Sequence, residues 1–446
     1  MSKAYAERDF GVARGNFDSR NGEIAMKSTR LCTAASVAAA CVIAVLTAQS
    51  AQAQTYKVLH TFKIRTDGAF PAAGVTRDAE RNLYGTTFGG GAHKNGTVFK
   101  LSNTGKETLL YSFTGGADGG GPESGVVRDA EGNFYGTTSY GGDLSCPSTP
   151  VGSGCGVVFK LSTIGKETVL YTFKGGTDGA EPQAGVIRDA EGNLYGTASY
   201  GGDLSESECQ GSGCGVVFKV SATGKETVLY SFTGGSDGGG PVQGVIRDEK
   251  GNIYGTTYVG GYKCQYTGCG VVFRLSKTGK ETVLYSFTGG TDGANPWSGV
   301  IRDGEGNLYG TTSRGGHLAG CSGSGCGTVF RLSKTNEEIV LYSFKLGTDG
   351  GVPQAGVIRD AEGNLYGTTS GGGNQSSGAG VIFKVDKADK ETVLYSFTGG
   401  TDGAYPTAVI QDANGNLYGT TIFGGDLSCG DPKEGSGCGV VFELTP

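Results

Sequence analysis

The sequence predicts an all-β protein: a seven-bladed β-propeller of four-stranded blades, the last of which is closed by the N-terminal strand. Three short phrases recur seven times each, at a period of 51 to 60 residues, and each phrase is rich in β-branched and aromatic residues between turn-forming ones. This period suits a propeller blade and is too long for one coil of a β-solenoid. With 85 glycines but only 11 prolines and no Gly-X-Y period, the composition excludes collagen.

The three phrases are variants of VLYSF, NLYGT and GVVFKLS, and a fourth phrase, GVIRD, precedes NLYGT. VLYSF ends at Phe62, Phe113, Phe173, Phe232, Phe287, Phe344 and Phe397. The tyrosines of NLYGT are Tyr84, Tyr135, Tyr195, Tyr254, Tyr309, Tyr366 and Tyr418. The phenylalanines of GVVFKLS are Phe99, Phe159, Phe218, Phe273, Phe330, Phe383 and Phe442.

Each blade is expected to run from the channel to the rim in the order GVIRD, NLYGT, GVVFKLS, ETVLYSF. The apolar residues of VLYSF and GVVF are continuous, which predicts strands buried on both faces. DAEGN and TGKE connect successive strands as tight hairpins, because their glycines can take a positive φ and an Asp side chain can cap a turn.

The ring is expected to close through the two ends of the repeat region. This region begins with a rim strand, TYKVLHTF at 55–62, and ends with a third strand, GVVFELTP at 439–446. Pairing these two strands completes the seventh blade and removes exposed sheet edges. Burial of Val58, Leu59 and Phe62 is expected to contribute roughly 1.5–3 kcal/mol each.

The combined phrase LYSFTGGTDGA.P..GVIRDAEGNLYGTTSYGG...GVVFKLS resembles the tandem repeat of the GloVer (choice-of-anchor) family of secreted bacterial proteins. Its P..GV..D..GN.Y part is also similar to the phrasing of NHL-type and kelch-type propellers. The resemblance covers about residues 55–446 and implies a secreted or surface location with no assigned activity. Because no anchor precedes the end at Pro446, we expect a released protein, or one retained by binding.

Residues 1–53 are predicted to contain a signal peptide. Lys27 and Arg30 precede an apolar run at 31–46, and a small-x-small cleavage site ends at Ala53. The alternative is a membrane anchor, since the apolar run is nearly long enough to span a bilayer.

Translation is expected to start at Met26, directly before this pattern, so that the mature protein is a single propeller over residues 54–446. Cleavage near Ala53 would leave a secreted protein, extracellular or periplasmic, with no membrane insertion. The chain has a net charge of −6 and no basic cluster in its repeat region, which argues against nucleic acid as a partner. We expect a monomer.

Ten cysteines follow the leader in five local pairs, each inside a loop between NLYGT and GVVF. The pairs are Cys146/Cys155, Cys209/Cys214, Cys264/Cys269, Cys321/Cys326 and Cys429/Cys438. An even count with local pairing behind an export signal predicts disulfides. The gaps do not match zinc knuckles, and only His60, His93 and His317 could complete a metal site, so neither a metal nor another cofactor is expected.

Functional residues are expected on the face that carries these disulfide-stapled loops, because variable loops on a rigid scaffold carry binding. Residues present in every blade describe a fold rather than one catalytic constellation. Arg188, Asp189 and their equivalents are therefore interpreted as turn caps and inter-blade ion pairs. The Asp of GGTDG lacks the D-x-D-x-D-G context of a calcium loop.

Residues that differ between blades are the better candidates for binding. Exposed aromatic side chains beside carboxylates and amides suit sugar rings; the alternative is that these aromatics pack against neighbouring loops. The candidate ligand-binding residues are Trp297, Tyr140, Tyr200, Arg314, Phe423, Glu123, Glu181, Gln183 and Tyr405.

The favoured function is binding of an extracellular glycan or protein through the stapled loops. The first alternative is a carbohydrate- or lactone-active enzyme at the channel mouth, where Glu123 and Glu181 could serve glycoside hydrolysis. The second is a passive surface scaffold. No catalytic residue is assigned, because the sequence contains no G-x-S-x-G, H-E-x-x-H or phosphate-loop motif.

Overall fold

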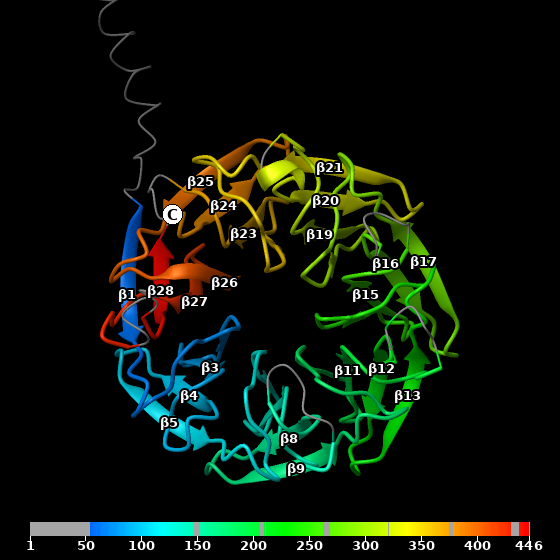
Figure 1. Ribbon diagram of the computed structural model, residues 1–446. Coiled ribbons are helices and arrows are strands. Elements are labelled where there is room, and N and C mark those ends of the chain that lie inside the picture. The colour runs from blue at the N-terminus through cyan, green and yellow to red at the C-terminus, as the bar shows by residue number, and fades with distance from the viewer. Residues whose placement is uncertain are drawn as a thin grey trace, which may run out of the picture. The chain divides into compact units, whose positions relative to one another are not determined.

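The computed structural model describes residues 54–146, 152–205, 209, 211–261, 268–319, 321–373, 378–429 and 437–445. Seven antiparallel four-stranded sheets stand around a central opening, which confirms the predicted seven-bladed propeller (Figure 1). The predictions for residues 1–53, including the start at Met26 and cleavage near Ala53, lie outside the described residues. Within the described ranges, no helix is long and apolar enough to cross a membrane.

Each sheet is one blade, and its strands follow one another from the channel to the rim. Blade one contains β2 (Thr76–Arg77), β3 (Leu83–Thr87), β4 (Thr97–Leu101) and β5 (Glu107–Ser112). Blade two contains β6 (Val127–Arg128), β7 (Phe134–Thr138), β8 (Val157–Leu161) and β9 (Glu167–Thr172). Blade three contains β10 (Ile187–Arg188), β11 (Leu194–Ala198), β12 (Val216–Val220) and β13 (Glu226–Ser231). Blade four contains β14 (Ile246–Arg247), β15 (Ile253–Thr257), β16 (Val271–Leu275) and β17 (Glu281–Ser286).

The remaining blades follow the same plan, with a longer inner strand in the seventh. Blade five contains β18 (Ile301–Arg302), β19 (Leu308–Thr312), β20 (Thr328–Leu332) and β21 (Glu338–Ser343), with the 3-10 turn η2 (Cys321–Gly323) in its loop. Blade six contains β22 (Ile358–Arg359), β23 (Leu365–Thr369), β24 (Val381–Val385) and β25 (Glu391–Ser396). Blade seven contains β26 (Ala404–Gln411), β27 (Leu417–Phe423), β28 (Val440–Thr445) and β1 (Thr55–Thr61).

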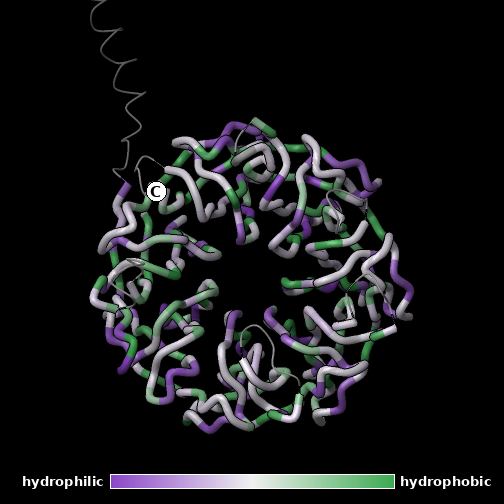
Figure 2. Tube along the Cα trace, in the orientation of Figure 1, coloured by the Kyte–Doolittle hydropathy of each residue, from purple (hydrophilic) through white to green (hydrophobic). Residues whose placement is uncertain are grey.

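The second and third strands of each blade are buried on both faces, whereas the rim strands are not. In blade three every residue of β11 and all but Lys219 of β12 are buried, but β13 is only partly buried. The prediction of two-sided burial therefore holds for GVVF and is wrong for VLYSF. The physical reason is radial: neighbouring blades diverge from the channel outward, so their faces separate at the rim. Figure 2 shows hydrophobic residues inside the blades and hydrophilic ones at many outer turns.

Among the described residues, seven hydrophobic clusters join neighbouring blades, and each contains residues of a phenylalanine pair. The buried Phe that follows each rim strand meets the third-strand Phe of the next blade edge to face, with ring centroids 5.0–5.5 Å apart. The pairs are Phe62–Phe99, Phe113–Phe159, Phe173–Phe218, Phe232–Phe273, Phe287–Phe330, Phe344–Phe383 and Phe397–Phe442. The glycine of NLYGT makes room for these rings, since a Cβ on Gly310 would lie 2.7 Å from Phe330 Cζ.

The ring closes as predicted, because β1 pairs antiparallel with β28 and forms the rim of blade seven. Phe62 is fully buried, but Val58 and Leu59 are only partly buried, so full burial of all three is wrong. Tyr56 contributes instead, because its ring stacks on Tyr395 of blade six at 4.0 Å between centroids.

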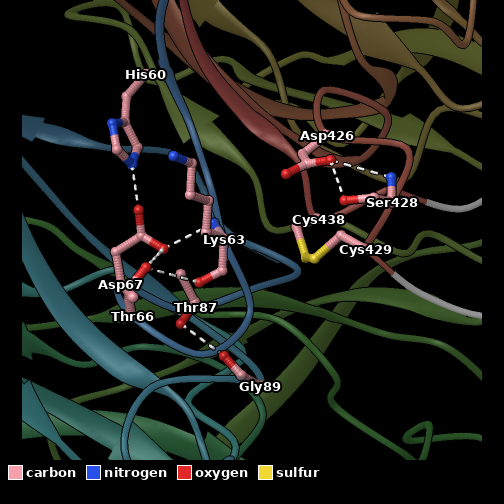
Figure 3. Close-up of a disulfide and its surroundings, with 10 residues drawn as sticks. All are labelled: His60, Lys63, Thr66, Asp67, Thr87, Gly89, Asp426, Ser428, Cys429 and Cys438. Carbon is pink, nitrogen blue, oxygen red and sulfur yellow. Dashed lines mark hydrogen bonds and ion pairs between the residues drawn. A yellow bond between two sulfur atoms is a disulfide. The ribbon is translucent and has the colours of Figure 1, made fainter.

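His60 of β1 gives the closing junction a contact of its own. Its Nε2 atom lies 2.9 Å from an Asp67 carboxylate oxygen in the segment that leads into blade one (Figure 3). At the other junctions a tyrosine fills this place; for example, the Tyr285 hydroxyl donates to Asp292. The N-terminal strand thus serves as a rim strand that contacts the equivalent aspartate through a histidine instead of a tyrosine.

The VIRDAEGN turns are built by their aspartates, as predicted. Asp189 accepts hydrogen bonds from the Asn193 backbone N–H at 2.8 Å and from the Tyr195 hydroxyl at 2.9 Å. The arginine before it serves the blade interface differently, because the Arg188 guanidinium lies 5.4 Å from the ring centroid of Tyr135 in the preceding blade.

An inter-blade ion pair of an arginine within 4.0 Å, the role expected of these arginines, occurs in the described ranges only between Arg77 and Asp412, at 3.6 Å. The GGTDG aspartates also cap turns: Asp292 accepts from the Thr288 backbone N–H at 2.7 Å. No group of three potential metal-ligating side chains occurs among the described residues.

Candidate ligand-binding site at the channel mouth

The site is built on the lead-in segments, which carry the chain from the rim of one blade to the inner strand of the next. The residue before the proline of each lead-in segment has a φ of +51° to +61°. These residues are Phe70, Gly121, Glu181, Gly240, Asn295, Val352 and Tyr405. Only two are glycine, and a β-branched residue such as Val352 rarely adopts this conformation, so tertiary contacts must impose it.

Those contacts come from the stapled loop of the preceding blade. The Glu181 N–H donates to the carbonyl oxygen of Cys155 at 3.1 Å, and the Val352 N–H donates to that of Cys326 at 2.7 Å. The second cysteine of a staple therefore holds the next lead-in segment in place. In the loops without cysteine, Asn95 and Ala379 supply the carbonyl instead.

Four of the five predicted disulfides lie within the described residues, and all four form. They are Cys146–Cys155, Cys209–Cys214, Cys321–Cys326 and Cys429–Cys438, with Cα atoms 5.4–5.8 Å apart. Figure 3 shows the Cys429–Cys438 bond beside the closing junction. Cys264 lies outside the described residues, so its pairing with Cys269 stays a prediction.

The residues directly after the lead-in prolines meet at the mouth of the channel. All seven line one cavity of about 440 Å³. They are Ala72, Glu123, Gln183, Val242, Trp297, Gln354 and Thr407. Because equivalent positions carry different side chains, the cavity is asymmetric, and Gln243 adds a further amide from the adjacent position. Its volume lies within the range of small-molecule sites.

Two further cavities share walls with this central one. The first, of about 380 Å³, is lined by Phe70, Phe88 and Phe423 and shares Ala72, Glu123 and Ile422 with the central cavity; we call it the apolar cavity.

The second, of about 490 Å³, is lined by Tyr200 and Tyr258 and shares Gln183, Val242 and Trp297 with the central cavity; we call it the tyrosine cavity. The Trp297 ring meets Tyr258 edge to face, with centroids 4.8 Å apart.

Glu123 is the titratable group of the central cavity. Burial and the nearby Glu181 carboxylate raise its pKa to about 7, against the opposing effect of hydrogen bonds with Ser139 and Gln183. Its buried Oε1 atom has no hydrogen-bond partner among the described residues. The carboxyl group therefore takes up a proton more readily than an exposed glutamate does and, when protonated, can donate a hydrogen bond as well as accept one.

The structure brings together five of the nine candidate residues. Trp297, Glu123 and Gln183 line the central cavity, Trp297 and Gln183 also line the tyrosine cavity with Tyr200, and Phe423 lines the apolar cavity. Their role in binding stays a prediction.

The other four candidates lie outside the three cavities. Tyr140 packs against Phe88 and donates to Asn95 Oδ1 at 3.2 Å, as the alternative of loop packing expects. Glu181 is 2% exposed and lines none of the three cavities. Arg314 and Tyr405 are exposed, and Tyr405 packs edge to face on Phe423.

Sequence reasoning missed Gln354, Phe88 and Tyr258. Gln354 follows a lead-in proline, so reading that single position across all repeats finds it. Phe88 and Tyr258 replace a serine that directly follows the second strand in four other blades, at Ser139, Ser199, Ser313 and Ser370. Three of these serines bond the lead-in carbonyl and Ser199 bonds Gln183, so their replacement removes a polar tie where a cavity forms.

Comparison with solved structures finds other propeller-containing enzymes at low identity. A gluconolactonase from Xanthomonas campestris is 14% identical over 65% of this chain and 78% of its own, with a TM-score of 0.37. A luciferin-regenerating enzyme is 13% identical over 88% and 95%, with a TM-score of 0.38. A candidate oxidoreductase (glucose dehydrogenase) from Thermus thermophilus is 12% identical over 88% and 100%, with a TM-score of 0.42. Similarities of this size say nothing about activity.

No curated protein matches the sequence. The sequence profile of the Gloeobacter/Verrucomicrobia repeat, in contrast, matches residues 42–209 and 205–432. These two matches span most of the chain and agree with the resemblance that the repeated phrases predict. The chain belongs to the Gloeobacter/Verrucomicrobia repeat family.

Proposed function

We propose that the channel mouth on the stapled face binds carbohydrate. The observation that carries this proposal is the convergence of the seven residues after the lead-in prolines on one cavity, where Trp297 stands with Glu123 and the amides of Gln183 and Gln354. A sugar presents apolar C–H faces, which pack on an aromatic ring, and hydroxyl groups, which exchange hydrogen bonds with amides and carboxyl groups. These side chains supply both kinds of contact within one concave site.

A protein partner is the alternative occupant of this face. Stable protein interfaces bury about 800 Å² on each partner over broad complementary surfaces. The variable side chains here are gathered in a recessed cavity at the centre of the ring instead. This geometry favours a small hydroxylated ligand over a flat protein surface.

The experiment is a glycan array probed with the purified protein, its Trp297→Ala variant and its Leu318→Ala variant. Leu318 is exposed in a stapled loop of the blade that follows Trp297 and lines none of the three cavities, so it is the matched control. Binding to a glycan class that is lost in Trp297→Ala and kept in Leu318→Ala is expected. Absence of glycan binding, or equal binding by both variants, would overturn the proposal.

Hydrolysis of the bound glycan is a second candidate function, favoured by one observation. Glu123 faces the cavity with a pKa raised by burial to about 7, as a general acid requires. Glycoside hydrolysis needs a second carboxylate flanking the scissile bond, whereas Glu181 does not line the cavity. Binding is therefore the primary proposal. The enzyme alternative expects turnover that disappears in Glu123→Gln while glycan binding remains.

We also propose that the protein acts outside the cytoplasm. The support is the set of local disulfides, which persist in oxidising compartments and are rare in reducing ones. Thiol labelling of the protein isolated from its native cells tests this location. Disulfide-bonded staples are expected, and free thiols at these positions would contradict it.

A further inference from the structure

We infer that the ligand is a linear oligosaccharide of at least three sugar units, which lies across the channel mouth from the apolar cavity to the tyrosine cavity. This inference rests on the proposed carbohydrate function and names the size and shape of the ligand. It follows from the adjacency of the three cavities, from their position in the ring and from the order of their side chains.

The three cavities adjoin one another, because the central cavity shares lining residues with each of the others. Ala72, Glu123 and Ile422 border both the apolar and the central cavity. Gln183, Val242 and Trp297 border both the central and the tyrosine cavity. A ligand that fills the centre therefore reaches the edge of both flanking cavities.

The two ends of this path lie on opposite sides of the ring. The apolar cavity is lined by residues at the junction of blades seven and one, including Phe423 of β27 and Phe70 of the first lead-in segment. The tyrosine cavity lies at the junction of blades three and four, which is across the central opening in Figure 1. A single sugar unit cannot contact both ends, whereas an extended chain can.

The side chains along the path alternate in a way that suits successive sugar units. Aromatic rings stand at both ends, Phe70, Phe88 and Phe423 at one and Tyr200, Tyr258 and Trp297 at the other. The centre between them offers amide groups and the Glu123 carboxyl group. Terminal units would stack on the rings, and the central unit would exchange hydrogen bonds with the amides and with Glu123.

The flanking cavities also contain all three positions at which another residue replaces the serine after the second strand. At the junctions where a serine follows the second strand, its hydroxyl ties down the lead-in segment; Ser313 Oγ donates to the Asn295 carbonyl at 2.7 Å, and Ser370 Oγ to that of Val352 at 2.8 Å. Of the three residues that replace this serine, Phe88 and Ile422 line the apolar cavity and Tyr258 lines the tyrosine cavity, which Ser199 also lines. The repeat thus departs from its own pattern at the positions that the path needs.

Calorimetric titration with cello-, xylo- and chito-oligosaccharides of one to six units tests the inference. We expect affinity for the recognised series to rise at least tenfold from one to three or more units. Phe423→Ala and Tyr200→Ala, at opposite ends, should each weaken binding of the longest chain about tenfold and reduce the gain in affinity from one to three units. Tyr200 is exposed, so its variant keeps the test valid if loss of Phe423 destabilises the protein.

Leu427→Ala is the control for Phe423→Ala, because Leu427 is exposed in the loop that follows Phe423 and lines none of the three cavities. Affinity independent of chain length, with Trp297 still required, would overturn the inference and leave the proposed carbohydrate function standing. Binding of no glycan of any length would overturn both.

Discussion

The face that carries the DAEGN and TGKE turns and the face that carries the stapled loops are made by the same seven repeats, yet they differ in how much their copies vary. On the turn face, one pattern returns in blade after blade: Asp129, Asp189 and Asp360 each accept from the asparagine four residues later and from the tyrosine six residues later. On the stapled face, the position after each lead-in proline holds side chains as different as Ala72, Glu123 and Trp297. The residues that repeat form the scaffold, and the residues that differ between blades form the candidate site.

The largest expected effect on the scaffold is the loss of ring closure. A chain that begins at residue 66 lacks β1, which leaves β28 as an exposed edge and removes Phe62 from the cluster it forms with Phe99. Truncating a buried phenylalanine alone costs about 3–5 kcal/mol, and the deletion should cost more. Thermal unfolding of the shortened and the full chain measures this loss of stability. Equal melting of the shortened and full chains would refute closure by β1.

The matched control for closure is a pair of single substitutions within β1 and just after it. Phe62→Ala should destabilise by about 3–5 kcal/mol, because Phe62 is fully buried. Val58→Ala should cost clearly less, because Val58 is only partly buried. A larger effect at Val58 than at Phe62 would contradict the observed packing of the rim.

A second scaffold test compares two glycines of blade five. A Cβ on Gly310 would lie 2.7 Å from Phe330 Cζ, whereas a Cβ on Gly304 would meet no atom within 4 Å. Gly310→Ala should therefore cost about 1–3 kcal/mol of stability through overpacking, and Gly304→Ala should be neutral or slightly stabilising. Denaturant unfolding of both variants decides; similar stabilities would show that the phenylalanine rings do not require the glycine.

Two disulfides compare the scaffold with the site directly. Cys209–Cys214 lines the tyrosine cavity, and Cys321–Cys326 lines none of the three cavities. Both close loops of the same length, so replacing either pair with serine should cost about 2 kcal/mol or less. Glycan affinity should fall further in the Cys209→Ser, Cys214→Ser variant. Equal losses of affinity in the two variants would mean that the staples act on stability alone.

The smallest expected effect per site is a pH dependence of stability that arises from glutamates in the rim strands. Burial, together with the aspartate in the segment that leads into the same blade, raises the pKa of five rim-strand glutamates to about 7. They are Glu167, Glu226, Glu281, Glu338 and Glu391. An acid whose pKa is raised by folding stabilises the fold fully below its ordinary pKa of 4.5, and this stabilisation is lost as the pH rises through about 7.

The melting temperature should therefore fall from pH 5 to pH 8. Each glutamate is half-exposed, so solvent screening limits its contribution to less than about 1 kcal/mol. The Glu281→Gln side chain stays neutral at all pH values. The melting temperature of this variant should therefore fall less steeply with pH, by the contribution of one glutamate. A melting temperature that rises over this range would contradict the assignment.

The fold could be predicted from the sequence because its information is repeated and local. Seven copies of each phrase set the blade number, and a chain that starts with a rim phrase implies closure by that strand. The degree of burial at the rim could not be predicted, because VLYSF and GVVF have the same apolar pattern. Leu229 of a rim strand is half-buried and Val217 of a third strand is fully buried, and the difference arises because the gap between blades widens toward the rim.

The site could be predicted only in part. Trp297 and Glu123 stand out because no other blade has them at that position. Gln354 was hidden because it lies in the same PQAGV phrase as Gln183 and so looked like part of the repeat. Phe88 and Tyr258 could not be predicted for a different reason. Each replaces a serine, and the hydrogen bond that this serine makes in other blades is visible only in the three-dimensional structure.

The single tryptophan of the chain provides the most direct test of the central claim, that the non-repeated residues of the channel mouth form the binding site. Trp297 lines both the central and the tyrosine cavity, so its fluorescence reports on this site alone. Titration with the glycan identified on the array should shift or quench the emission with the same Kd that calorimetry gives. Calorimetric binding with an unchanged Trp297 spectrum would place the ligand elsewhere on the propeller and contradict the claim.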